Sequence, residues 1–221
     1  PEATPCTSYT IGYDANDSIV LVKVHEADWA KILKVKLGRG EAEDKRMIRL
    51  IRSVSDKPIY VDANQGWPTK EHALMMCQWL AKQGVVMIEQ PMPKHMDEEH
   101  KWLCEQVELP ILADEACQIY DDVARLAPYY DGINIKLMKC GGLAEARKMI
   151  TLARELGKQV MIGCMTETRA GISAATTLSP LVDYADLDGH VLLGNDPYDG
   201  IQIVDGKLTL VDKPGTGVSP L

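Results

Sequence analysis

Short apolar runs recur along the chain and alternate with longer segments whose apolar positions repeat at helical spacing. The runs are typical of buried strands, and the amphipathic segments between them are typical of helices. Strands are expected at 8–12, 32–37, 58–64, 85–91, 110–115, 132–137, 159–165 and 184–190. Helices are expected at 18–30, 41–54, 70–83, 98–107, 119–126, 143–156 and 170–178. This alternation of strands and helices predicts a parallel sheet.

The spacing of the expected strands favours a barrel over an open sheet. From Lys36 to Met165 the successive strand ends lie about 22 to 29 residues apart, the length of one strand–helix unit. Eight such units predict a (β/α)8, TIM-like barrel in the α/β class. A doubly wound sheet would more often carry a glycine-rich nucleotide-binding turn after its first strand, and no such turn is present.

The last thirty or so residues differ in character from the barrel. Turn-forming Pro, Gly and Asp residues surround two short expected strands at 200–204 and 207–211, which are suited to a hairpin about Asp205-Gly206. We therefore expect a barrel domain at 1–191 and a separate C-terminal segment at 192–221.

Local signals define some helix starts and turns. Ser18 is expected to cap the first helix, and Thr69 the third. Gly38 and Gly40 flank Arg39 and could cradle a phosphate, but no GxxxxGK motif continues from them. An ordinary turn between strand and helix is therefore favoured.

The composition indicates a single-core protein that acts on a small molecule. The 221 residues are 46% hydrophobic, and 24 Lys+Arg against 32 Asp+Glu give a net charge of −8. The charges are dispersed, so neither a nucleic-acid nor a membrane partner is expected. No secretory signal and no apolar run of transmembrane length occurs, and a cytoplasmic location is expected. The six cysteines show no CxxC spacing and are expected to be buried reduced thiols.

Two lysines share one face of the second expected strand. Because side chains alternate along a strand, Lys34 and Lys36 point the same way. Inside a barrel, the repulsion between them would lower the pKa of at least one, which would make it a base. On an edge strand the same pair would be an ordinary solvated face. Lys136 ends the sixth expected strand, on the far side of the barrel from Lys36.

Three acidic residues end consecutive expected strands. Asp62, Glu89 and Asp114 follow apolar runs at the third, fourth and fifth strands, and barrel active sites lie at the carboxyl ends of strands. One such acid is most often a helix cap or turn residue, but three together require a cation. All-oxygen ligation favours Mg2+, with Mn2+ as an alternative, over zinc. Asn64 and Glu115 could support these ligands or be ordinary loop residues.

These groups together suggest proton transfer next to a carboxylate. A bound Mg2+ can hold a substrate carboxylate and stabilise the enediolate that forms when the adjacent carbon loses a proton. Lys36 and Lys136 would then act as acid and base, and the charge of Lys34 would lower the pKa of Lys36.

Five spaced motifs resemble the enolase superfamily, in its muconate-lactonizing subgroup. They are Lys34-Val35-Lys36, Asp62-Ala63-Asn64, Glu89-Gln90-Pro91, Ala113-Asp114-Glu115, and Asn134-Ile135-Lys136 followed by Gly141-Gly142. The general chemistry described for that superfamily is a lysine base with a Mg2+-stabilised enediolate. The resemblance implies a modified (β/α)7β barrel and an N-terminal α+β capping domain, which we expect to be missing from a chain that opens at Pro1. Segment 192–221 resembles the piece that packs against this cap, so we expect a fragment or a processed form.

Within that subgroup, Asp186-Leu187-Asp188 looks like the DxD motif of dipeptide epimerases, which holds the free ammonium group of the substrate. The same acids could instead form a turn. Residues 163–167 resemble the seventh-strand segment of these enzymes, and Thr10, Met165 and Glu167 are expected to contact substrate.

The implied reaction inverts the α-carbon of the C-terminal residue of a dipeptide such as Ala-Glu by 1,1-proton transfer. The alternatives are a cycloisomerase or an o-succinylbenzoate synthase of the same subgroup, and a catalytically silent ligand-binding barrel. A homo-oligomer is compatible with each of these functions.

Overall fold

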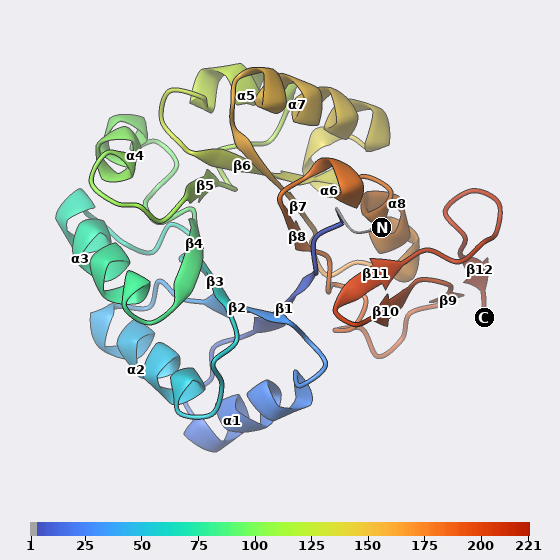
Figure 1. Cartoon of the computed structure of the whole chain (residues 1–221), viewed down its shortest axis with the longest axis horizontal. Helices are drawn as coiled ribbons and strands as arrows, with labels where there is room; N and C mark the ends of the chain where they lie inside the picture. The colour runs from blue at the N-terminus through green and yellow to red at the C-terminus, as the bar shows by residue number, and fades with distance from the viewer. Residues whose placement is uncertain (1–3) are drawn as a thin grey trace.

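Eight parallel strands form the centre of the computed structural model, which describes residues 4–221 (Figure 1). Pro1, on which the expectation of a fragment depends, lies outside the described residues. The strands are β1 (Ser8–Ile11), β2 (Ile32–Lys36), β3 (Ile59–Asp62), β4 (Val85–Glu89), β5 (Ile111–Ala113), β6 (Gly132–Lys136), β7 (Gln159–Gly163) and β8 (Tyr184–Asp186). They are hydrogen-bonded in sequence order, and a parallel bridge from Thr7 to Ala185 brings β8 beside β1. The predicted barrel is confirmed.

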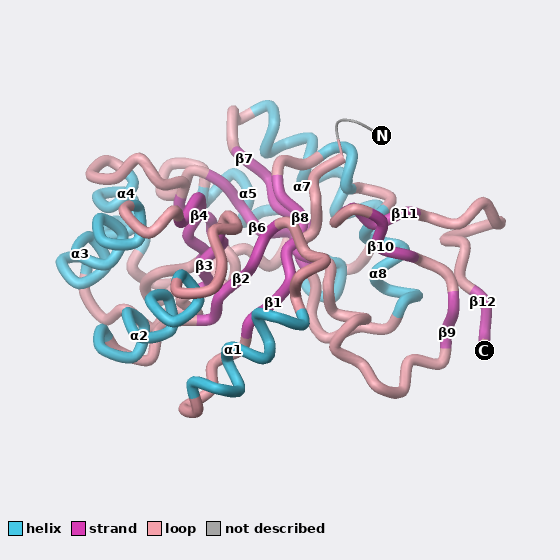
Figure 2. Tube along the Cα trace, turned by 60° about the horizontal axis from the view of Figure 1, so that its bottom comes forward, coloured by secondary structure: helices cyan, strands magenta, loops and turns pink. Residues whose placement is uncertain are grey.

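The helices surround the strands, as Figures 1 and 2 show. They are α1 (Asp17–Glu26), α2 (Glu41–Arg52), α3 (Lys70–Ala81), α4 (Asp97–Cys104), α5 (Tyr120–Leu126), α6 (Leu137–Cys140), α7 (Leu143–Glu155), α8 (Arg169–Thr176) and the 3-10 helix η1 (Ser179–Leu181). Each of the first seven strands is followed by an α-helix, and β8 leads instead into the C-terminal segment. The arrangement is therefore the modified (β/α)7β barrel. None of the described helices is both long and apolar enough to cross a bilayer.

Apolar side chains on the helix-facing side of the strands form the main core. In α2, for example, Met47, Ile48 and Ile51 are buried, as their helical spacing predicts. A smaller apolar layer fills the barrel interior itself, built from Tyr60, Met87, Leu112 and Met161. This inner layer closes the barrel below the polar side chains at the carboxyl ends of the strands.

The first helix differs from the sequence prediction at both ends. It begins after Asn16, whose side chain accepts a hydrogen bond from Ser18 N at 2.9 Å, so the expectation that Ser18 caps it is wrong. The helix ends at Glu26 instead of continuing to Ala30, because 27–30 turn into β2. Thr69 does cap α3, with its Oγ1 accepting from His72 N at 3.2 Å.

The C-terminal segment lies against one side of the barrel, beside α8 (Figure 2). Strands β10 (Gln202–Val204) and β11 (Lys207–Thr209) form the predicted antiparallel hairpin, with Asp205 and Gly206 at positive φ in its turn. A second pair, β9 (Tyr198–Asp199) with β12 (Ser219–Pro220), was not predicted.

Candidate active site

A cavity of about 400 Å3 opens at the carboxyl ends of the barrel strands. Ten of the residues predicted for the site line it: Thr10, Lys34, Lys36, Asn64, Asp114, Glu115, Lys136, Met165, Asp186 and Asp188. Asp62 and Glu89 are fully buried next to it and contact Lys34. Residues that are far apart in sequence therefore converge because the strands carrying them end at one mouth of the barrel.

Three buried carboxylates lie together at this mouth. Asp62 and Glu89 are opposite one another in the β3–β4 register, and Asp114 follows the last residue of β5. One oxygen of each carboxylate lies within 4.8 Å of one oxygen of each of the others. Burial and the neighbouring Asp62 raise the pKa of Glu89 to about 8, which shows that a further negative charge is unfavourable here.

The donor set fits a hard divalent cation. Asn134, whose Nδ2 donates to Glu89 Oε1 at 2.7 Å, has a buried Oδ1 without a hydrogen-bond donor among the described residues. An orphaned oxygen is costly unless a cation or water completes its contacts. Asp62, Glu89 and Asp114 together offer the all-oxygen ligation that Mg2+ or Mn2+ prefers.

Lys34 is enclosed by carboxylates. Its ammonium lies 2.7 Å from Glu89 Oε2, 2.8 Å from Asp186 Oδ2 and 3.2 Å from Asp62 Oδ2, and its side chain is 1% exposed. Burial alone would lower the pKa of Lys34, but the three acids outweigh burial and hold that pKa well above its usual value. Lys34 is thus a permanent cation whose charge is compensated, and its predicted electrostatic effect on Lys36 stays a prediction.

Lys36 and Lys136 approach the cavity from opposite walls. They end β2 and β6, which are four strands apart in the eight-stranded barrel. Lys36 Nζ donates to Asp62 Oδ2 at 2.6 Å, and Lys136 Nζ donates to Asp114 Oδ2 at 2.6 Å. Each of the two amino groups therefore lies at the edge of the carboxylate cluster, and both side chains line the cavity.

Two further acids form the wall beside β1 and β8. Ser8 Oγ donates to Asp186 Oδ1 at 2.7 Å, and the backbone N–H of Thr10 donates to Asp188 Oδ2 at 2.7 Å. Among residues 4–221, Asp188 forms no ion pair. Burial and the adjacent Asp186 raise the pKa of Asp188 to about 6. This wall is suited to bind a cationic group.

The two residues predicted to support the ligands do lie next to them. Asn64 N donates to Asp62 Oδ1 at 3.0 Å, and Asn64 Nδ2 donates to Glu115 Oε1 at 3.2 Å. Met165 lines the cavity and is 44% exposed. Glu167 is not among the residues that line the cavity; its Oε1 accepts a hydrogen bond from Met165 N at 2.9 Å, and its expected contact with substrate stays a prediction. The carboxylate of Glu167 therefore binds the backbone of its own loop.

Lys139 is a buried cation that the sequence reasoning missed. It belongs to α6, one helical turn after Lys136, and its Nζ donates to Asp114 Oδ1 and to Asp114 O, both at 2.7 Å. Burial would raise the pKa of Asp114, but Lys139 and Lys136 outweigh burial and lower it. The i,i+3 spacing of two lysines after a strand was the available signal.

Gln90 connects two of the carboxylate-bearing strands. Its Oε1 accepts from Asp114 N at 3.0 Å and from Ala116 N at 3.1 Å, while its Nε2 donates to Tyr130 Oη at 3.0 Å. Next to it, the buried ring of His100 accepts from Met92 N at 3.4 Å. This network fixes the backbone that presents Asp114.

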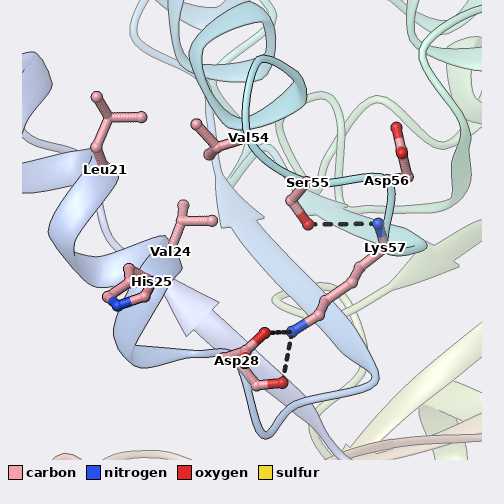
Figure 3. A pocket seen from close by; sticks show the side chains of 8 residues that line it. All are labelled: Leu21, Val24, His25, Asp28, Val54, Ser55, Asp56 and Lys57. Atoms are coloured by element: carbon pink, nitrogen blue, oxygen red, sulfur yellow. Dashed lines mark hydrogen bonds and ion pairs between the residues drawn. The ribbon is translucent and has the colours of Figure 1, made fainter.

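A second hollow, of about 580 Å3, lies between the C-terminal ends of α1 and α2, at the opposite end of the barrel (Figure 3). Its one lysine, Lys57, donates to Ala27 O and Asp28 O at 2.9 and 2.8 Å. Because the backbone of its own wall already binds this cation, we place the chemistry at the carboxyl ends of the strands.

Comparison with known proteins gives one family over most of the chain. The family model described as "Enolase C-terminal domain-like" matches residues 20–221. Over 218 residues the chain is 55% identical to an L-Ala-D/L-Glu epimerase of Bacteroides thetaiotaomicron, which covers 98% of this chain and 56% of that protein. It is 41% identical to an L-Ala-D/L-amino acid epimerase of Flavobacterium johnsoniae, over 100% of this chain and 64% of that protein. The chain thus spans less than two thirds of the length of these relatives.

Solved structures agree with this comparison. The dipeptide epimerase from Cytophaga hutchinsonii, complexed with Mg and the dipeptide D-Ala-L-Val, superposes with a TM-score of 0.90 at 27% identity. The match covers 99% of this chain and 62% of that chain. The dipeptide epimerase from Enterococcus faecalis gives a TM-score of 0.89 at 34% identity, over 98% of this chain and 66% of that one.

Proposed function

Because this chain belongs to the enolase C-terminal domain-like family, we propose that a protein containing this barrel epimerises dipeptides in a Mg2+-dependent reaction. The substrate class is that of the L-Ala-D/L-Glu epimerase with which the chain is 55% identical. The observation that carries the proposal is one cavity with two lysines on opposite walls, three clustered carboxylates and a separate acidic pair.

Asp62, Glu89 and Asp114 would hold the Mg2+, with Mn2+ as a possible substitute. When bound, the ion supplies positive charge that stabilises the substrate carboxylate as the neighbouring carbon loses its proton. Asn64, Glu115 and Lys139 would keep the ligands oriented through their hydrogen bonds to Asp62, to Asn64 and to Asp114 respectively.

Lys36 and Lys136 would move the proton. With the α-carbon between them, one lysine removes the proton from one face and the other returns a proton to the opposite face, which inverts the configuration. Lys34 would remain protonated and hold Asp62, Glu89 and Asp186 in place. Its role is to position the acids and to set the local charge.

Asp186 and Asp188 would bind the free ammonium group of the dipeptide, and Thr10 and Met165 would line the same wall. This pair favours an epimerase over a cycloisomerase or an o-succinylbenzoate synthase, whose substrates have no ammonium group to bind. The two opposed lysines, Lys36 and Lys136, argue against a silent ligand-binding barrel, because a protein that only binds a ligand has no use for them beside a metal site.

All six cysteines are free thiols, which is consistent with the proposed cytoplasmic location.

The test is deuterium incorporation from D2O into a library of L,L-dipeptides, followed by mass spectrometry. We expect exchange and inversion at the C-terminal α-carbon with Mg2+, and loss of both when EDTA removes the ion. The Asp188→Asn variant should raise KM for dipeptides, because it loses the charge that binds the ammonium group. If no dipeptide exchanges in the presence of Mg2+, or if KM is unchanged in that variant, the epimerase proposal is wrong.

A further inference from the structure

The turn that follows β2 is held by a buried carboxylate from α2. Asp44, which is 1% exposed, accepts hydrogen bonds from Gly38 N and Arg39 N, both at 3.0 Å, and from Trp67 Nε1 at 2.9 Å. No cation of residues 4–221 forms an ion pair with Asp44. A buried charge is costly unless donors satisfy it, so the three N–H groups are held around this carboxylate.

Asp44 thereby connects the backbone after β2 with the loop after β3. Gly38 has φ +87°, and a Cβ at this position would lie 2.1 Å from Ala63 O. A Cβ on Gly66, next to Trp67, would lie 2.3 Å from Gly38 Cα. Only glycine allows the two segments to approach this closely. The hydrogen bonds of Asp44 hold both sides of this contact, Gly38 on one side and Trp67 on the other.

The two connected segments follow Lys36 and its carboxylate partner. Lys36 is the last residue of β2, two positions before Gly38, and its Nζ donates at 2.6 Å to Asp62, the last residue of β3. The side chain of Lys36 is 35% exposed, whereas that of Lys136 is 7% exposed. Because packing encloses Lys136 more fully than Lys36, the position of the Lys36 amino group depends more on the backbone that carries it.

We propose that Asp44 is a positioning residue for Lys36. Asp44 does not line the cavity, and it acts through the backbone after β2 and the loop after β3. The inference rests on the proposed function, because it takes Lys36 to serve one face of the substrate α-carbon and Lys136 the other. Misplacing a reacting group by about 1 Å can cost about a hundredfold in rate. The effect of losing Asp44 should therefore fall on one face alone.

The test follows deuterium incorporation from D2O into L-Ala-L-Glu and L-Ala-D-Glu separately, at saturating Mg2+. The epimer that Lys36 serves is the one whose exchange is lost in the Lys36→Ala variant. Asp44→Asn keeps the size of the side chain but replaces one acceptor oxygen with a donor. In this variant kcat for exchange of the Lys36-served epimer should fall about ten- to a hundredfold, and exchange of the other epimer should stay within about twofold.

A second variant and a control separate positioning from a general loss of structure. Trp67→Phe removes one of the three hydrogen bonds but keeps an aromatic ring, so it should show the same selectivity with a smaller loss. Asp131→Asn is the matched control, because Asp131 also accepts a backbone hydrogen bond, from Ile111 N at 3.0 Å, but at the opposite end of the barrel. The control should leave exchange of both epimers within about twofold.

An equal fall for the two epimers, a fall confined to the epimer that Lys136 serves, or no fall for either would overturn the assignment of Asp44 while leaving the epimerase proposal intact. If Asp44→Asn does not fold in urea titrations, the same comparison in Trp67→Phe decides the question. Failure of the unmodified protein to exchange any dipeptide would overturn both.

Discussion

Replacement of Lys34 by Met tests the electrostatic core of the site. Lys34 forms ion pairs with Asp62, Glu89 and Asp186 at once, at 3.2, 2.7 and 2.8 Å. Methionine keeps most of the length and apolar stem of lysine, so packing changes little while the charge is lost. Three buried carboxylates would then face one another with weaker compensation.

We expect the Lys34→Met variant to lose about 3 to 5 kcal/mol of unfolding free energy without metal, the usual cost of removing one partner from a buried ion pair. This is a large share of the roughly 5 to 15 kcal/mol that stabilises a typical domain. Lys148→Met is the matched control, because Lys148 is 62% exposed and its single ion pair, with Glu145, lies at the surface. That variant should show no measurable change, since exposed pairs contribute little.

Urea denaturation followed by circular dichroism gives the unfolding free energy of both variants, first in EDTA and then in Mg2+. Mg2+ should stabilise the Lys34→Met variant more than the unmodified protein, because the added cation replaces part of the missing charge. A loss in EDTA no larger than that of Lys148→Met would refute this account of Lys34. Equal stabilisation of variant and unmodified protein by Mg2+ would show that Lys34 and the metal site are uncoupled.

Three further predictions concern pH and positioning. Because the pKa of Asp188 is raised to about 6, its carboxylate protonates as pH falls below that value, so KM for dipeptides should rise between pH 7 and pH 5. A KM that stays constant over this range, or that rises equally in the Asp188→Asn variant, would contradict the proposal that Asp188 binds the ammonium group of the substrate. Burial lowers the pKa of His100 to about 4 from 6.5. The unfolded chain therefore takes up the proton on this histidine first, so His100 should contribute a loss of about 2 kcal/mol in unfolding free energy between pH 7 and pH 5, which urea titrations measure as the difference between the unmodified protein and His100→Gln. Gln90→Leu removes the acceptor for Asp114 N and should weaken Mg2+ binding by about tenfold in calorimetry, whereas unchanged affinity would mean that Gln90 does not position Asp114.

The barrel could be predicted from the sequence because its signal is repeated. Each strand is a short apolar run followed by a helix. An error at the boundary of one element therefore does not alter the predicted order of strands and helices. The start of α1 was mispredicted because Asn16 and Ser18 are both good caps, and only the backbone decides that Asn16 accepts the hydrogen bond. Element ends of this kind depend on turns that a local pattern does not specify.

The candidate site was predictable where side chains end strands, because the barrel brings all strand ends together. Asp62, Glu89 and Asp114 were found in this way, and their carboxylates do lie together, with one oxygen of each within 4.8 Å of one oxygen of each of the others. Gln90 was missed as a positioning residue because its hydrogen bonds reach Asp114 across the sheet, 24 residues away. The hydrogen bond from Met165 N to the Glu167 carboxylate was not predicted, because the motif that suggests Glu167 as a substrate contact does not specify the conformation of its loop.

The most direct test of the central claim separates the two faces of the substrate α-carbon. In D2O with Mg2+, the unmodified protein should incorporate deuterium into both L,L- and L,D-dipeptides and should interconvert them. The Lys36→Ala variant should exchange only one of the two epimers, Lys136→Ala only the other, and neither variant should invert configuration. Exchange of the same epimer by both variants, or inversion by either one, would contradict the proposal that these two lysines act from opposite walls of the barrel.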